Sequence, residues 1–165
     1  MEPHAYSIVR NQFKKAPRAI QDLLLSPKLT ESLKTITAKH TQDKEKRDAV
    51  ENEVMMVLLG LESLNDLEAN LTEEGSFTQE QAIHIAQDIT LSIILPVENE
   101  LRVFLQKELA TSEENIPLSA ENNAEESPEK EMGRQAEGVE IEKIKNLLRE
   151  NRKTVSVKNI VANLK

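Results

Sequence analysis

The sequence predicts an all-α protein: a small helical bundle of five or six helices followed by a tethered C-terminal segment. Leu, Ile, Val and Ala supply most of the apolar residues, whereas aromatic residues make up only 2% of the chain. Four glycines and six prolines in 165 residues are too few for a β-sandwich or barrel, which needs a turn about every 8–12 residues. Apolar residues recur instead at spacings of three and four, which is the pattern of helix faces.

The first two helices of the bundle are predicted on either side of Ser26. One begins at Pro17, whose missing N–H is not needed in a first helical turn, and it ends before Ser26. Ser26 then caps the second helix, which has Pro27 at its first position and runs to about Lys39. Residues 1–16 are expected to form a flexible basic N-terminus, because chain ends are loose unless they are tied down.

The stretch Ala49–Leu71 has the densest apolar run and is predicted to be central to the core. Asp43 can cap its helix, whose first turns, KEKRDAVENE, are almost wholly charged. Glu51 and Glu53 lie two positions apart and therefore point about 200° apart on a helix. They are not expected to act together on one substrate. The apolar face that follows comprises Val50, Val54, Met55, Met56, Val57, Leu58, Leu59 and Leu61.

Two more helices complete the predicted bundle after a short capped helix at Ser63. That helix is expected to end at Gly75, with the glycine in the left-handed conformation. Thr78 and Gln81 form a capping box for a long helix through Ile94. Pro96 either kinks this helix or begins the next one, which runs to about residue 109.

No pattern of catalytic or metal-binding residues is evident, so a non-enzymatic protein without a cofactor or metal is expected. His40 is interpreted as a helix-terminal residue, and His84 with Asp88 as an exposed pair four residues apart. The chain lacks cysteine, which favours a reducing compartment and hence a cytoplasmic protein. Its longest apolar run, Val54–Leu59, is far shorter than the roughly 20 residues that span a bilayer, so no membrane span is expected.

Charge divides the chain into a predicted bundle domain, residues 17–110, and two C-terminal parts. Residues 1–110 and residues 111–138 each carry a net charge of −6, whereas residues 139–165 carry +4. Residues 111–138 lose apolar periodicity and gain Glu, Ser, Asn and Pro, which predicts an acidic disordered linker.

Residues 139–165 are predicted to form a basic, amphipathic helical hairpin or one broken helix, with Ser156 capping the second part. Such a small unit buries too little to be stable alone, so it must dock on the bundle, on a second copy or on another protein. This predicts a protein–protein interaction or adaptor module with an unidentified partner, or self-association. The expected contact residues are Ile144, Leu147, Leu148, Ile160, Val161 and Leu164.

The alternative is a nucleic-acid or ribosome-associated protein that uses the basic tail. Its phosphate contacts would be Lys143, Lys145, Arg149, Arg152, Lys153 and Lys158. The absence of an aromatic residue from the tail and the negative net charge weigh against this reading.

Residues 27–109 also carry a set of core-type residues found in a known group of proteins. The set comprises Lys39, His40, Glu53, Leu58, Leu59, Gly60, Leu61, Asp66, Leu67, Ala82, Ile85, Ala86 and the segment Ile93–Val97. In these residues the chain resembles a group of short, uncharacterised helical proteins of small-genome bacteria from the candidate phyla. The resemblance implies a helical bundle and brings no activity, ligand or catalytic residue.

Overall fold

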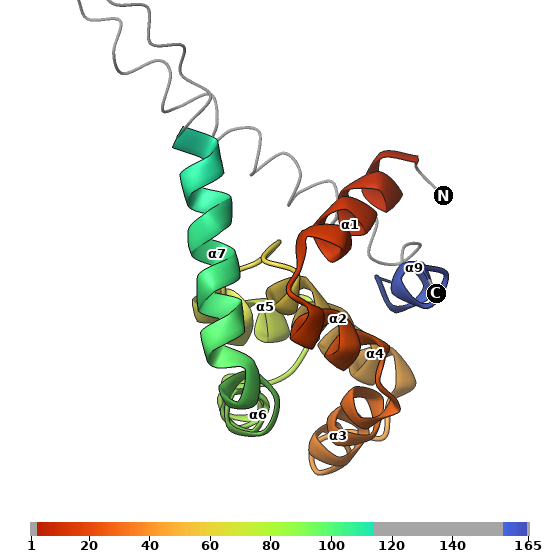
Figure 1. Ribbon diagram of the computed structural model, residues 1–165. Coiled ribbons are helices and arrows are strands. Elements are labelled where there is room, and N and C mark those ends of the chain that lie inside the picture. Colours follow the sequence, from red (N-terminus) through yellow and green to blue (C-terminus); the bar gives the residue numbers. More distant parts are fainter. Residues whose placement is uncertain (1–2, 114–156, 165) are drawn as a thin grey trace, which may run out of the picture.

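The computed structural model describes residues 3–113 and 157–164, and every regular element in these two ranges is a helix. The all-α prediction is therefore confirmed (Figure 1). The α-helices are α1 (Pro3–Lys15), α2 (Arg18–Leu25), α3 (Pro27–Ala38), α4 (Lys44–Leu58), α5 (Leu67–Glu73), α6 (Gln79–Ile89), α7 (Glu98–Glu113) and α9 (Val157–Ala162). Three short elements join them: η1 (Leu64–Asp66), η2 (Thr90–Ile94) and η3 (Leu95–Val97).

Four of the predicted helix starts are confirmed by their caps, whereas Pro17 directly precedes α2 without a side-chain cap and the predicted cap Ser156 lies outside the described residues. The side chains of Ser26, Asp43 and Ser63 each accept a hydrogen bond from the backbone N–H two residues later. Thr78 and Gln81 form the reciprocal capping box in front of α6. Each cap satisfies a donor that has no partner within its own helix, which is why these short-range patterns place helix starts reliably.

Helix α4 is the centre of the bundle. Every residue from Val50 to Leu59 is buried, and Met55 and Met56 lie in the core with the valines and leucines around them. Helix α4 contacts α2 and α3, which precede it in the sequence, and α5 and α9, which follow it. A helix that is buried over most of its circumference needs neighbours all round, and α4 has them.

Two glycines explain the close packing at the ends of α4 and α5. Gly60 has a φ of 69°, and a Cβ atom there would lie 2.8 Å from Leu105 Cδ2 of α7. The prediction that Gly75 takes the left-handed conformation is wrong, because Ser76 takes it instead, with a φ of 52°. Gly75 is required for a different reason: a Cβ atom would lie 2.7 Å from both the carbonyl oxygen of Leu71 and the Phe77 ring.

The chain leaves α6 through a π-helical turn, η2, and a 3-10 turn, η3, before α7 begins. Pro96 lies in η3 and cannot donate a hydrogen bond to the turn before it, so both the kink and the new helix occur. Helix α7 continues to Glu113, three residues into the predicted linker. Residues 114–138 of that linker lie outside the described residues.

The N-terminus differs from the expectation. Residues 1–16 were expected to be loose, but Pro3–Lys15 form α1, and Val9, Phe13 and Ala16 are buried. Helix α1 packs chiefly against α9, from the other end of the chain, and the two helices lie side by side in Figure 1. The apolar cover that orders α1 is thus distant in sequence, and local patterns do not reveal it. The predicted bundle range contains the six α-helices α2 to α7, as expected, and α1 and α9 pack on it in addition.

Candidate functional site

The most informative site is the place where the C-terminal helix docks on the bundle. Helix α9 lies against α1, α2 and α4. Its residues Val157, Ile160 and Val161 are each only 1% exposed, and Leu164 is partly buried beside them. Helix α9 thus docks on its own bundle, which was one of the three possibilities that the amphipathic pattern of residues 139–165 left open.

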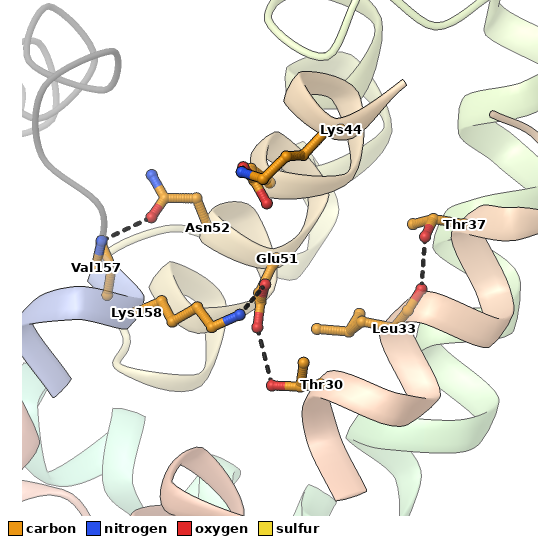
Figure 2. A network of polar contacts seen from close by, with 9 residues as sticks. Thr30, Leu33, Thr37, Lys44, Glu51, Asn52, Val157 and Lys158 are labelled. Atoms are coloured by element: carbon orange, nitrogen blue, oxygen red, sulfur yellow. Dashed lines mark hydrogen bonds and ion pairs between the residues drawn. The ribbon is translucent and has the colours of Figure 1, made fainter. Parts of the chain in front are cut away.

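Two side chains of α4 hold α9 in place through polar contacts (Figure 2). Asn52 Oδ1 accepts a hydrogen bond of 2.9 Å from the backbone N–H of Val157, the first residue of α9. Glu51 Oε2 accepts one of 3.0 Å from Lys158 Nζ. The first contact satisfies a backbone donor at the start of a helix, and the second neutralises a carboxylate that is 10% exposed.

Glu51 also connects α9 to α3. Its second carboxylate oxygen accepts a hydrogen bond of 3.0 Å from the Thr30 hydroxyl. Because Lys158 keeps 44% of its side chain exposed, the ion pair is screened by water and is worth about 1 kcal/mol or less. We name the set Thr30, Glu51, Asn52 and Lys158 the polar latch.

The next residue of α4, Glu53, belongs to a separate buried cluster. Asn70 of α5 donates from Nδ2 to Glu53 Oε2 at 3.1 Å and also to Glu62 Oε2. All three side chains are buried. Glu51 and Glu53 therefore serve different partners, as their spacing on a helix predicts. The cluster joins α4, α5 and the connection between them, since buried carboxylates must be hydrogen-bonded.

Sequence reasoning missed the structural role of the Glu51-Asn52-Glu53 triplet. The sequence shows only that the first turns of this helix are almost wholly charged, yet all three residues of the triplet are buried. The available signal was the position of these polar residues directly beside Val50 and Val54, inside the apolar run. Buried polar residues at such positions bind partners from other elements, and those partners are not visible in the sequence.

The predicted partner-binding residues fall into two groups. Ile160 and Val161 are buried in this chain's own core and Leu164 is partly buried, so the docked helix does not present them to another protein. Ile144, Leu147 and Leu148 lie outside the described residues. Of the predicted phosphate contacts, Lys158 is paired with Glu51. The remaining five, Lys143, Lys145, Arg149, Arg152 and Lys153, also lie outside the described residues.

The two histidines singled out in the sequence meet in the structure. The rings of His40 and His84 stack in parallel with their centroids 6.4 Å apart. Asp88 does not pair with His84 as expected but with Lys39, at 2.8 Å. This hydrogen bond is the main cause of a lowered pKa for the Asp88 carboxyl, and the positive charge of Lys39 and the two histidines add to it. Contact between α3 and α6 creates this arrangement.

Residues 3–113 and 157–164 contain no group of three His, Asp or Glu side chains able to hold a metal ion. In the same ranges no helix has both the length and the apolar character needed to cross a membrane. Comparison of the chain with family models, with curated proteins and with solved structures found no match.

Proposed function

We propose that this protein is a non-enzymatic protein–protein interaction module that works by exchange of its C-terminal segment. In the resting protein α9 occupies its own bundle. In the complex, the apolar face that includes Ile160 and Val161 engages a partner instead. The observation that supports this proposal is the way α9 is held: three apolar side chains and two polar contacts, at the far end of residues 114–156.

The energetics of docking favour exchange. Burying Val157, Ile160 and Val161 contributes about 6 kcal/mol, at about 2 kcal/mol for each side chain. The two polar contacts add about 2 kcal/mol. Ordering the backbone of residues 157–164 costs about 8 kcal/mol, at about 1 kcal/mol for each residue. Gain and cost are of similar size, so docking is worth at most a few kcal/mol and a partner needs to supply little free energy to compete for α9.

The connection to the bundle adds a kinetic advantage. A segment that stays tethered can leave its groove and return without being lost, because its effective concentration at the groove remains high. Apolar residues spaced three and four apart on a short helix match the helix-in-groove mode of recognition. The nucleic-acid alternative gains no support from the described residues, since Lys158 is already paired with Glu51.

The experiment compares the proteins that are captured by variants of the full-length chain, each with one or two substitutions. Asn52→Ala removes the acceptor for the first N–H of α9 but leaves the sequence of α9 intact. This variant should undock α9 more often and capture more of any specific partner from the native cell. Adding Ile160→Asp to it should abolish capture, because a carboxylate replaces an apolar contact residue. Asn65→Ala is the matched control, since Asn65 is exposed and its side chain has no contact with α9.

Partners that are enriched by Asn52→Ala and lost in the double variant would support the proposal. If Asn52→Ala and Asn65→Ala capture the same proteins in the same amounts, exchange of α9 is not how this chain binds partners. If Ile160→Asp has no effect on a partner's capture, that partner binds another surface and the proposed role of α9 is refuted.

A further inference from the structure

A pocket of about 260 Å³ opens between α1 and α9. Four of its described lining residues lie on α1, and the other two directly follow the last residue of α9. None of the six is acidic. They are Tyr6, Arg10, Phe13, Lys14, Asn163 and Leu164. In a chain with a net charge of −8, a pocket whose only charged lining residues, within the described part of the chain, are cations is unusual and sets this site apart.

The two cations of this pocket, Arg10 and Lys14, have no acidic partner among the described residues. Arg10 and Lys14 lie four residues apart and so share one face of α1, which has no Asp or Glu between Pro3 and Lys15. Both are exposed, and neither side chain makes an ion pair or hydrogen bond to any residue in the described part of the chain. Two like charges held together on one helix face repel each other, and an anion placed between them would relieve that repulsion.

The shallow pocket between α3 and α6 provides a contrast. It is lined by lysines as well, but also by Glu31 and Asp88, and Lys39 there is already bound to Asp88. Cations whose charge is satisfied within the protein offer little to an anionic ligand. Of these two pockets, the one between α1 and α9 is lined by cations that make no ion pair within the described residues.

The remaining walls of the α1–α9 pocket indicate what the anion carries. Phe13 is buried and Tyr6 is half-buried, so both present ring surface to the cavity beside the apolar Leu164. A guanidinium matches the geometry of a phosphate, and an aromatic wall suits a flat, weakly polar body. The cavity volume of about 260 Å³ lies just below the range of about 300–1,000 Å³ that is typical of small-molecule sites. The pocket therefore has room for no more than one small molecule.

We propose that this pocket binds a small organic phosphate with a planar ring, of the size of a mononucleotide. Arg10 and Lys14 hold the phosphate, while Tyr6 and Phe13 contact the ring. Because Asn163 and Leu164 of the docked C-terminal segment complete the pocket, the ligand binds the docked form better than the undocked form. Binding and docking must then strengthen each other by the same factor, whether or not a partner protein exists.

The test uses the full-length chain with adenosine monophosphate, adenosine and inorganic phosphate as probes in titration calorimetry at low ionic strength. Adenosine monophosphate should bind to one site, with the other two probes weaker by about tenfold or more, since each retains only half of the contacts. Arg10→Gln and Lys14→Gln should each weaken binding of the monophosphate by about tenfold. Lys34→Gln, which removes an exposed charge elsewhere, should leave it unchanged.

A second readout is hydrogen exchange at residues 157–164, which the monophosphate should slow in the wild type but not in Arg10→Gln. Thermal unfolding of each variant establishes that it is folded. The proposal is overturned if the monophosphate shows no saturable binding, if inorganic phosphate binds equally well, or if Lys34→Gln weakens binding as much as Arg10→Gln. Binding without slower exchange at α9 would also overturn it, because the ligand would then lie elsewhere.

Discussion

Truncation of one buried side chain in α9 should undock both ends of the chain while the central bundle stays folded. Ile160 is 1% exposed, and its replacement by alanine typically costs about 2–5 kcal/mol. A loss of about 3 kcal/mol shifts a two-state equilibrium by roughly a hundredfold. Since docking of α9 is worth at most a few kcal/mol, Ile160→Ala should leave α9 largely undocked.

The effect should spread to α1, because α9 is the helix against which α1 chiefly packs. Native-state hydrogen exchange is the assay, since it reports opening free energies segment by segment. In Ile160→Ala, amides of Val157–Ala162 and Pro3–Lys15 should lose protection, whereas those of α3 to α6 should keep theirs. Asn159→Ala, at an exposed position of the same helix, is the control and should change little.

Two results would refute this reasoning. If α1 keeps its full protection when α9 is undocked, contacts other than α9 order the N-terminus. If all helices lose protection to the same extent, α9 is part of the global folding unit and is not a separately docked segment.

Three further predictions concern the bundle itself. Asn70→Ala should lower the free energy of unfolding by about 2–3 kcal/mol, because it removes a donor from two buried carboxylates, and urea denaturation measures this. Gly60→Ala should cost about 1–3 kcal/mol in the same assay, because a Cβ atom there meets Leu105 and the φ is positive. Lys39→Gln should raise the pKa of the Asp88 carboxyl toward its usual value, as measured by NMR titration.

The sign of the pH effect at Asp88 follows from its lowered pKa. The ion pair with Lys39 stabilises the folded protein at pH values above about 4, which is the pKa of the Asp88 carboxyl in the unfolded chain. This stabilisation is lost as the pH falls through the lower pKa that the carboxyl has in the folded protein. Lys39→Gln should therefore destabilise the protein slightly at neutral pH and make acid unfolding less steep. An Asp88 pKa that does not change in this variant would mean that the pair is absent in solution. Asn65→Ala, at an exposed position, is the matched control for Asn70→Ala.

The helical class and most helix boundaries can be predicted from the amino-acid sequence alone, because they depend on interactions within a few residues. Ser26, Asp43 and Thr78 cap helices through bonds to backbone groups two or three positions away. Pro96 redirects the chain for an equally local reason, the absence of its N–H. Periodic apolar residues likewise placed α4 in the core, since a helix of known pitch fixes which residues share a face.

Which helices pack against one another, by contrast, cannot be predicted from these local patterns. An amphipathic C-terminal helix has the same pattern whether it docks on its own bundle, a second copy or a partner, and contacts with Glu51 and Asn52 place it on the bundle. The same limit applies to α1, whose apolar face is covered by residues from the opposite end of the chain. Arg10 and Lys14 line a pocket only because Asn163 and Leu164, from the opposite end of the chain, form its second wall. Long-range packing is set by the sum of many weak contacts, and no local spacing encodes it.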